Sequence, residues 1–181
     1  TDLGDFDWVV LTAPAPQTAR LAPAESGISE RAVTARMRAC CALLLGFDAP
    51  LDLPWDAALI GDADISWLSA NSSKPGRRDA VTLVAHSTNA WADENIDNDS
   101  AAIRAHLREQ CERVVGVAVN KPVYEYLHRW RFANIDKQQG EPFHVDKRLQ
   151  LGACGDWFIR GRVEAAFASA NKLAARLADI L

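Results

Sequence analysis

The sequence of 181 residues lacks several patterns that identify common functional classes. It contains no G-x-G-x-x-G loop, no G-x-S-x-G turn and no histidine pair at the H-x-x-x-H spacing. These absences argue against a complete dinucleotide-binding motif, an α/β-hydrolase and a helical zinc site in this sequence. We therefore expect no metal, and the sequence alone assigns no catalytic residue.

Long apolar runs and an excess of positive charge are also absent. No apolar run approaches the roughly 20 residues that a membrane helix requires. Lys and Arg number 20 against 24 Asp and Glu, which gives a net charge of -4. A chain of this charge offers no electrostatic footprint for nucleic acid or an anionic membrane. We expect neither as a partner.

The four cysteines, Cys40, Cys41, Cys111 and Cys154, show no C-x-x-C spacing. Two adjacent residues of a strand point to opposite faces, so Cys40 and Cys41 would not act together. We interpret all four as reduced, mostly buried thiols of a cytoplasmic protein. No signal peptide is expected, because Asp2, Asp5 and Asp7 stand where basic residues would open one.

An apolar segment lies close to the first residue, Thr1, and predicts a strand over about 8–11. Pro14 and Pro16 then end the strand, because proline cannot continue a hydrogen-bonded ladder. A strand so near the start suggests that a sheet partner precedes it. We therefore expect the chain to be a piece of a longer protein.

The remaining pattern predicts an α+β fold with a mostly antiparallel sheet. Strands are expected at 37–47, 58–60, 65–70, 80–86, 123–132 and 149–154, with 58–60 and 65–70 forming a hairpin. Helices are expected at 17–21, 100–115 and from 161 to the end. Segments 22–29, 71–79, 136–146 and the stretch through Asn89, Trp91 and Asp93 are expected to be loops. Asp97 or Asp99 would cap the helix at 100, and Gly116 would end it. The final helix has an apolar pattern at Val163, Ala166, Phe167, Ala170, Leu173, Ala174 and Leu177.

The tail combines a strand, the pair Gly155-Asp156, a short gap, Gly161 and a helix rich in small residues. A helix N-terminus presents unpaired N–H groups and partial positive charge, which suits a phosphate. Gly161 would let the backbone come close to a ligand, and Asp156 could accept hydrogen bonds from ligand hydroxyls. A capped helix packed on a sheet is the alternative interpretation of the same pattern.

Several motifs resemble one family of flavoproteins. Residues 151–157 and 161–166, LGACGDW and GRVEAA, resemble the C-terminal FAD motif of flavin-containing amine oxidases. Residues 6–17 resemble a strand that leads back toward the substrate domain in those enzymes. Residues 65–67 with 71–77, then 86–92 and 128–133, resemble the bacterial renalase-like branch. The resemblance covers essentially the whole chain.

The resemblance implies a two-domain FAD-dependent oxidoreductase of which this chain holds the C-terminal part. Residues 28–147 would form the substrate domain, and 1–27 and 148–181 would be returning pieces of a Rossmann-type FAD-binding domain. Because G-x-G-x-x-G is absent, the FAD site would be incomplete here and completed by a missing N-terminal Rossmann segment. The implied cofactor-binding residues are Gly155, Asp156, Gly161, Arg162 and Val163.

The substrate-binding residues that we expect are Trp67, Asn71, Lys74, Trp130 and Phe132. Trp130 and Phe132 belong to an alternating row that also holds Tyr124, Tyr126 and His128, and packing of one sheet face in a core is the alternative. For the loop around Lys74, a solvated surface turn is the alternative. We interpret His86 as a buried imidazole, His106 as solvent-facing and His144 as a loop residue.

Two residues depart from the family pattern. Ala165 stands where the family often has glycine, and its methyl group would either crowd the cofactor or point away. The strand that often carries a lysine near the flavin reads Ala39-Cys40-Cys41-Ala42 here. The missing lysine favours a renalase-like substrate over simple amine oxidation.

The function that follows is oxidation of a C–H bond next to nitrogen by hydride transfer to the flavin, with oxygen as acceptor. The implied substrate is a small amine or a dihydronicotinamide. The alternative is a non-catalytic binding module that lacks the cofactor and self-associates through an exposed sheet edge, so a homo-oligomer is a possible partner state.

Overall fold

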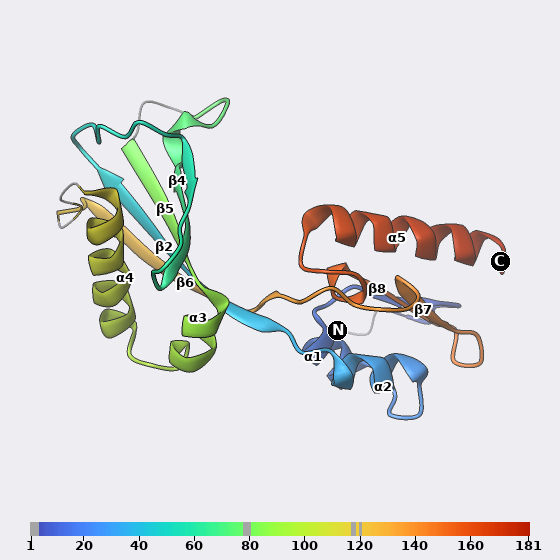
Figure 1. Ribbon diagram of the computed structural model, residues 1–181. Helices are drawn as coiled ribbons and strands as arrows, with labels where there is room; N and C mark the ends of the chain where they lie inside the picture. Colours follow the sequence, from blue (N-terminus) through green and yellow to red (C-terminus); the bar gives the residue numbers. More distant parts are fainter. Residues whose placement is uncertain (1–3, 78–80, 117–118, 120) are drawn as a thin grey trace. The chain divides into compact units, whose positions relative to one another are not determined.

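The computed structural model describes residues 4–77, 81–116, 119 and 121–181. The chain forms two compact units. Unit 1 combines the residues up to Met37 with Phe132–Leu181, and unit 2 is Arg38–Arg131. The order of helices and strands confirms the expected α+β fold class (Figure 1).

Unit 2 is built on a five-stranded sheet with strand order β3-β4-β5-β2-β6. The strands are β2 (Arg38–Phe47), β3 (Ala57–Leu59), β4 (Ile65–Ala70), β5 (Val81–Ser87) and β6 (Tyr124–Asn134). The pairs β3–β4, β4–β5 and β2–β5 are antiparallel. The expected hairpin and the long apolar strand are therefore confirmed.

Two helices cover one face of this sheet, α3 (Asn89–Asn95) and α4 (Ser100–Val115). Alternation in β5 sends Leu83 and Ala85 into the core with Ile103 and Leu107 of α4. A bulge between Ile65 and Trp67 lets both Ile65 and Leu68 point into that core. The opposite face carries no helix among the described residues of unit 2 (Figure 1). We call it the open face.

The ends of α4 are those expected from the sequence. The Asp99 carboxylate accepts hydrogen bonds from the N–H groups of Ala101 and Ala102 at 2.8 and 3.1 Å. Gly116 adopts the left-handed conformation with φ 69°, which glycine enters without steric cost. The short α3 was expected to be a loop; it forms because Thr88 caps it, with its hydroxyl accepting the N–H of Trp91.

Unit 1 holds a three-stranded sheet with order β1-β8-β7, made of β1 (Val9–Leu11), β7 (Phe143–Asp146) and β8 (Leu151–Cys154). β1 runs parallel to β8, whereas β7 pairs antiparallel to it. A short 3-10 turn, η2 (Asp156–Phe158), follows β8. A similar turn in unit 2, η1 (Asn71–Ser73), follows β4. β7 was expected to lie in a polar loop over 136–146; pairing with β8 decides its conformation.

Helices lie on both sides of the small sheet (Figure 1). α1 (Ala15–Leu21) and α2 (Gly27–Thr34) pack together on one side, and α5 (Val163–Ala178) packs on β7 and β8 from the other. α2 was missed by the sequence analysis, which expected a connection over 22–29. The side chain of Ser26 caps it by accepting the N–H of Ser29 at 3.1 Å.

The boundaries of the units differ from those expected at 27/28 and 147/148. Ile28 and Ala32 of α2 are buried in one core with Ala15, Trp157 and Phe158, so α2 belongs to unit 1. The pairing of β7 with β8 brings residues 132–147 into the same unit. The assignment of these units as substrate and FAD-binding domains stays a prediction.

The buried stripe of α5 also differs from the expected one. Ala165, Ser169 and Leu173 are buried, at a spacing of four residues, whereas Val163 and Phe167 are 84% and 69% exposed. The hydroxyl of Ser169 decides this orientation: it accepts the N–H of Gly155 at 2.9 Å and donates to the carbonyl of Pro142. The helical pattern predicted apolar residues on the buried side of α5. The buried Ser169 lies there instead, and its hydroxyl both accepts and donates a hydrogen bond.

All four cysteines are free thiols, and burial raises the pKa of each, to about 12 for Cys111. Within the described residues, none of the helices has the length and apolar character to cross a membrane.

Candidate functional site

The turn after β8 is held by the side chains of its own residues. The indole Nε1 of Trp157 donates to the carbonyl of Ala13 at 3.1 Å, and the Trp157 ring stacks on Phe158 with centroids 3.8 Å apart. A Cβ at position 155 would lie 2.9 Å from the Trp157 ring. Glycine is therefore required at 155 by the packing of this turn, whatever else binds there.

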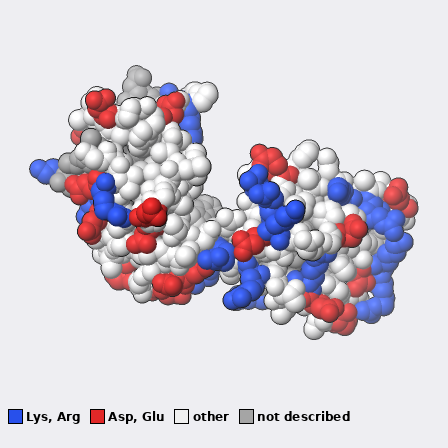
Figure 2. Space-filling view, in the orientation of Figure 1, with Lys and Arg blue, Asp and Glu red and all other residues white. Residues whose placement is uncertain are grey.

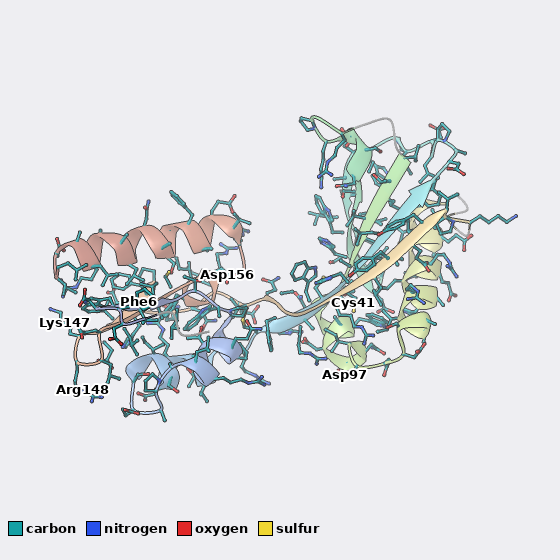
Figure 3. The ribbon with its side chains drawn as sticks, turned by 180° about the vertical axis from the view of Figure 1, so that it is seen from behind. Phe6, Cys41, Asp97, Lys147, Arg148 and Asp156 are labelled. Atoms are coloured by element: carbon teal, nitrogen blue, oxygen red, sulfur yellow. The ribbon has the colours of Figure 1, made fainter. Side chains whose placement is uncertain are left out.

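Asp156 lies beside the start of α5, as Figure 3 shows. Its carboxylate is half-buried, and this burial raises its pKa, an effect opposed by hydrogen bonds from the backbone N–H groups of Trp157 and Asp156 itself. No ion pair involves this carboxylate among the described residues. A fixed, uncompensated carboxylate at a strand end is suited to accept hydrogen bonds from ligand hydroxyls.

Gly161 makes a close approach to the chain itself. A Cβ there would lie 1.8 Å from the Asn134 Oδ1 and 2.9 Å from the Ile135 nitrogen, and the Gly161 N–H donates to the Ile135 carbonyl at 3.0 Å. The sequence predicted close approach to a ligand at this glycine, and missed Asn134. No local pattern points to Asn134, because it comes from 27 residues earlier in the chain.

A polar hollow of about 270 Å³ lies beside this contact. It is lined by Asn134, Ile135, Asp136, Lys137, Arg160, Gly161 and Arg162. Three of these residues are cationic and one is anionic, so the hollow favours a negatively charged group.

The start of α5 differs from the starts of α2, α3 and α4, each of which has a side-chain cap. The N-cap residue Arg162 provides none, and within the described chain no acceptor is found for the N–H groups of Val163 and Glu164. These N–H groups are available to an anion at the positive end of the helix. Ala165 is 6% exposed and belongs to the buried stripe, so its methyl group points into unit 1 and away from this end.

The predicted cofactor residues Gly155, Asp156, Gly161 and Arg162 therefore lie in the β8–α5 connection of unit 1, and Val163 is the first residue of α5. Lys147 and Arg148 mark the opposite end of the unit, in the β7–β8 turn (Figure 3). A half-buried carboxylate, uncapped N–H groups and a cationic hollow are donors and acceptors that fit the hydroxyls and phosphates of part of a dinucleotide.

The open face of unit 2 carries most of the predicted substrate-binding residues. Trp67 of β4 pairs directly with His86 of β5, so the two side chains share one face. Ser69 and Val84 pair next to them on the same face. Leu83 and Ala85, at the alternate positions of β5, point into the core. Trp67 and His86 therefore point to the open face.

The aromatic row of β6 lies on the same face. A Cβ at Gly46 would lie 3.2 Å from the Tyr124 Cβ, and Gly46 pairs with Thr82, two strand positions away from Val84. Adjacent rings of the row are in contact, with centroids 4.1 Å apart for His128 and Trp130. Tyr124, Tyr126 and Trp130 are 57%, 49% and 52% exposed, so the alternative of a row packed in a core is wrong for these three.

The other face of β6 points to the helices. The Glu125 carboxylate forms ion pairs with Arg104 and Arg108 of α4, at 3.3 and 2.9 Å. Arg129 donates to the carbonyls of Ile96 and Asn98. The alternation of β6 therefore separates an aromatic side from a side of charged contacts. The side of unit 2 away from α4 is mostly white in Figure 2, with few charged groups.

Asn71 lies in η1, and Lys74 follows it as an exposed residue at the end of the turn. The pKa of His86 is lowered by burial and then by the charge of Lys74. Trp67, Asn71, Lys74 and Trp130 therefore all belong to unit 2, while Phe132 groups with unit 1. The sequence analysis did not foresee His86 beside Trp67, because strand register is not visible in either strand alone.

The other histidines have separate environments. His106 was expected to face solvent; its Nε2 lies 2.8 Å from the Asp64 Oδ2, and its ring stacks on Trp91 with centroids 4.9 Å apart. His144 lies in β7, not in a loop, and its ring fills the space beside Gly27. No group of three or more metal-ligating side chains occurs in the described part of the chain.

Comparisons with known proteins place this geometry in a family. The sequence model of flavin containing amine oxidoreductases matches residues 1–178. Cyclohexylamine oxidase from Brevibacterium oxydans IH-35A shares the fold, with a TM-score of 0.65 and 15% identity over 94% of this chain and 42% of that chain.

A putative protoporphyrinogen oxidase from Exiguobacterium sp. 255-15 also shares the fold, with a TM-score of 0.64 and 17% identity over 83% of this chain and 36% of that chain. The A394C mutant of putrescine oxidase matches 66% of this chain and 28% of its own, with a TM-score of 0.54 and 16% identity. The chain therefore spans about two fifths or less of these solved structures. The family expected from the sequence is confirmed, and with it FAD as the family's cofactor: this chain belongs to the flavin-containing amine oxidoreductases.

Proposed function

We propose that this chain is the C-terminal part of an FAD-dependent oxidoreductase that oxidises a C–H bond next to nitrogen. The observation that carries the proposal is the β8–α5 connection, where the carboxylate of Asp156 and the uncapped N–H groups of α5 lie together in a chain of this family. FAD, when bound, supplies the redox chemistry by accepting a hydride and passing the electrons on, with oxygen as the proposed acceptor.

The residues of unit 1 would hold only part of that cofactor. Asp156 would accept hydrogen bonds from ribityl hydroxyls, and the N–H groups of Val163 and Glu164 would face the pyrophosphate or the flavin edge. The ADP part would be held by an N-terminal Rossmann segment that carries G-x-G-x-x-G. Two observations support this partner: β1 is an edge strand, and Val9 and Val10 on it are 44% and 43% exposed.

Unit 2 would supply the substrate wall. The open face offers Trp67 and Trp130 as flat surfaces that orient a ring and keep water away from it. Asn71 would add a hydrogen-bonding amide. These residues position the substrate and transfer no proton themselves, so their replacement should weaken binding more than it slows the chemical step.

The renalase-like branch is favoured by what the open face lacks. None of its positions in β2, β4, β5 and β6 carries a carboxylate: they are Cys40, Ala42, Leu44, Gly46, Trp67, Ser69, Thr82, Val84, His86, Tyr124, Tyr126, His128 and Trp130. A carboxylate is the usual partner of an ammonium group. A planar nitrogen ring such as a dihydronicotinamide therefore suits this face better than a small cationic amine.

A cytoplasmic location remains part of the proposal. It is supported by the four free thiols, which a reducing compartment would maintain.

The test uses the full-length protein and its visible spectrum. We expect flavin absorbance in the purified protein, and loss of most of it in Asp156→Ala, because the ribityl hydroxyls lose their acceptor. Asp179→Ala, at the exposed C-terminal end of α5, is the matched control and should keep the flavin. A colourless full-length protein would contradict the proposal.

A non-catalytic module that self-associates is the second candidate. It is supported by the exposed apolar residues at the β1 edge and on α5, among them Val163 and Phe167. A colourless protein whose sedimentation changes in Phe167→Glu would favour this candidate.

A further inference from the structure

One corner of the open face combines an aromatic ring, an imidazole and a cation. We call it the Lys74 corner, made of Trp67, Lys74 and His86. Trp67 and His86 are paired residues of neighbouring antiparallel strands, with side chains on one face. Lys74 ends η1, the turn that follows β4 and packs against β5, the strand that carries His86. Its positive charge acts on the His86 imidazole.

The cation of this corner has no carboxylate partner among the described residues. Lys74 makes no ion pair among the described residues, although the structure contains several such pairs elsewhere in unit 2. Four carboxylates of unit 2 each form an ion pair with a histidine or an arginine: Asp64, Asp93, Asp97 and Glu125. The positive charge of Lys74, which is an exposed residue, is therefore not neutralised by an ion pair within the described residues.

The His86 imidazole adds a hydrogen-bond donor to this corner without adding a second positive charge. Burial and the neighbouring cation both lower the pKa of His86, so the ring is neutral at physiological pH and carries one N–H. Its ring atoms form no hydrogen bond within the described part of the chain. A neutral N–H and an ammonium group together suit an anionic oxygen and oppose a second cation.

We propose that the Lys74 corner is a subsite for an anionic group, a carboxylate or a phosphate, on a planar substrate whose ring lies on the Trp67 side chain. This inference rests on the proposed function, because it takes the open face as the substrate wall. Lys74 and His86 are then specificity-determining residues: they favour an anion-bearing ring and disfavour an ammonium-bearing one of the same size.

The experiment compares two probes that differ mainly in charge. Benzoate and benzylamine are titrated into flavin-loaded full-length protein at pH 7.5, and binding is followed as a change in flavin absorbance. We expect benzoate to bind at least about tenfold tighter than benzylamine. Inorganic phosphate and acetate, added as competitors, distinguish a phosphate from a carboxylate preference.

Variants connect the preference to the corner. Lys74→Met should weaken benzoate binding about tenfold, and Lys74→Glu should reverse the order of the two probes. Lys121→Met is the matched control, since Lys121 is an exposed lysine that lines a different hollow of unit 2. His86→Gln, which keeps an N–H donor, should retain the preference, and His86→Leu should weaken it.

A readout on the present chain separates this proposal from the proposed function. In Lys74→Met the pKa of His86, followed by NMR of the imidazole, should rise, because the neighbouring positive charge is gone. Flavin-loaded protein that binds benzylamine as tightly as benzoate, or whose preference survives Lys74→Met, would overturn the subsite alone. A colourless full-length protein would overturn both proposals.

Discussion

The two units of this chain leave different kinds of apolar surface exposed. In the described residues, unit 2 has a core of fourteen buried residues under α3 and α4, and its exposed large rings stand in one row on the open face. Unit 1 has a buried cluster of eight, and its exposed apolar side chains include Val9 and Val10 on an edge strand and Val163 and Phe167 on α5.

The difference separates a surface built to contact a small molecule from one built to contact protein. Aromatic rings with histidines on a sheet face offer stacking and hydrogen bonds to a ligand. Apolar groups at a strand edge and along a helix offer mainly burial, which another segment of sheet and helix would supply. Unit 2 has the larger buried cluster, while unit 1 exposes two valines on an edge strand.

The largest expected effect is a loss of unfolding free energy, and it tests whether the two units unfold independently. Leu107→Ala in unit 2 and Leu173→Ala in unit 1 should each cost about 2–5 kcal/mol, because both side chains are almost fully buried. Hydrogen exchange by mass spectrometry should show the loss of protection mainly in the unit that carries the substitution. Leu59→Ala, with Leu59 84% exposed, is the control. Equal loss in both units would show that they unfold as one.

The next effect concerns the close approach inside unit 1. Gly161→Ala should destabilise the chain by about 1–3 kcal/mol, since the new methyl group meets Asn134 and the backbone of Ile135. Gly61→Ala, in unit 2, adds a methyl group where no atom lies within 4 Å, and should change little. Urea unfolding of the two variants measures the difference. An unchanged midpoint in Gly161→Ala would show that the 134–161 contact adapts easily.

A smaller effect compares a capped helix with an uncapped one. Asp99→Ala should cost about 1 kcal/mol, because two N–H groups of α4 lose their acceptor. Arg162→Asp should stabilise the flavin-free chain by up to about 1 kcal/mol, because α5 gains a cap it lacks. Thermal unfolding followed by circular dichroism measures both. No gain in Arg162→Asp would mean that the first N–H groups of α5 already have acceptors.

The smallest expected effect is a dependence of stability on pH. Burial lowers the pKa of His86 in unit 2 and of His144 in unit 1 below the usual value for histidine, helped by the charges of Lys74 and Arg31 respectively. As the pH falls, the unfolded chain therefore binds protons at a higher pH than the folded chain does. The free energy of unfolding should decrease as the pH drops from 7.5 to 5.5. Glutamine at either position should flatten this slope in urea unfolding at the two pH values. A slope unchanged in both single variants would contradict the assignment.

Local pattern was sufficient where one segment decides its own structure. The helix α4 with its Asp99 and Gly116 ends follows from helical spacing, and the β3–β4 hairpin from turn residues. The long strand β2 is an apolar run without a decisive period, and the turn at 48–50 that follows it favoured a strand. The motifs around Asp156 indicated the family, which the family comparison confirmed over residues 1–178. Short elements such as α2, α3 and β7 were missed because their stability comes from caps and pairing.

The candidate site was only partly visible in the sequence. Trp67, Asn71, Lys74 and Trp130 were expected as substrate residues, and the structure puts all four in unit 2. His86 beside Trp67 and Asn134 beside Gly161 were not foreseen. Each of those contacts joins residues 19 to 27 positions apart, and no short pattern records which residues meet across that distance.

The sequence by itself determined the alternation of β5 and β6, the uncapped start of α5, the absence of a G-x-G-x-x-G loop and the lack of a carboxylate at the open-face positions. Only the tertiary structure decided that Trp67 stands opposite His86, that Ser169 turns Phe167 outward, and that α2 joins unit 1. The reason is physical: a side chain's periodicity is fixed along the backbone, whereas its neighbour across a sheet or core is fixed by register and packing.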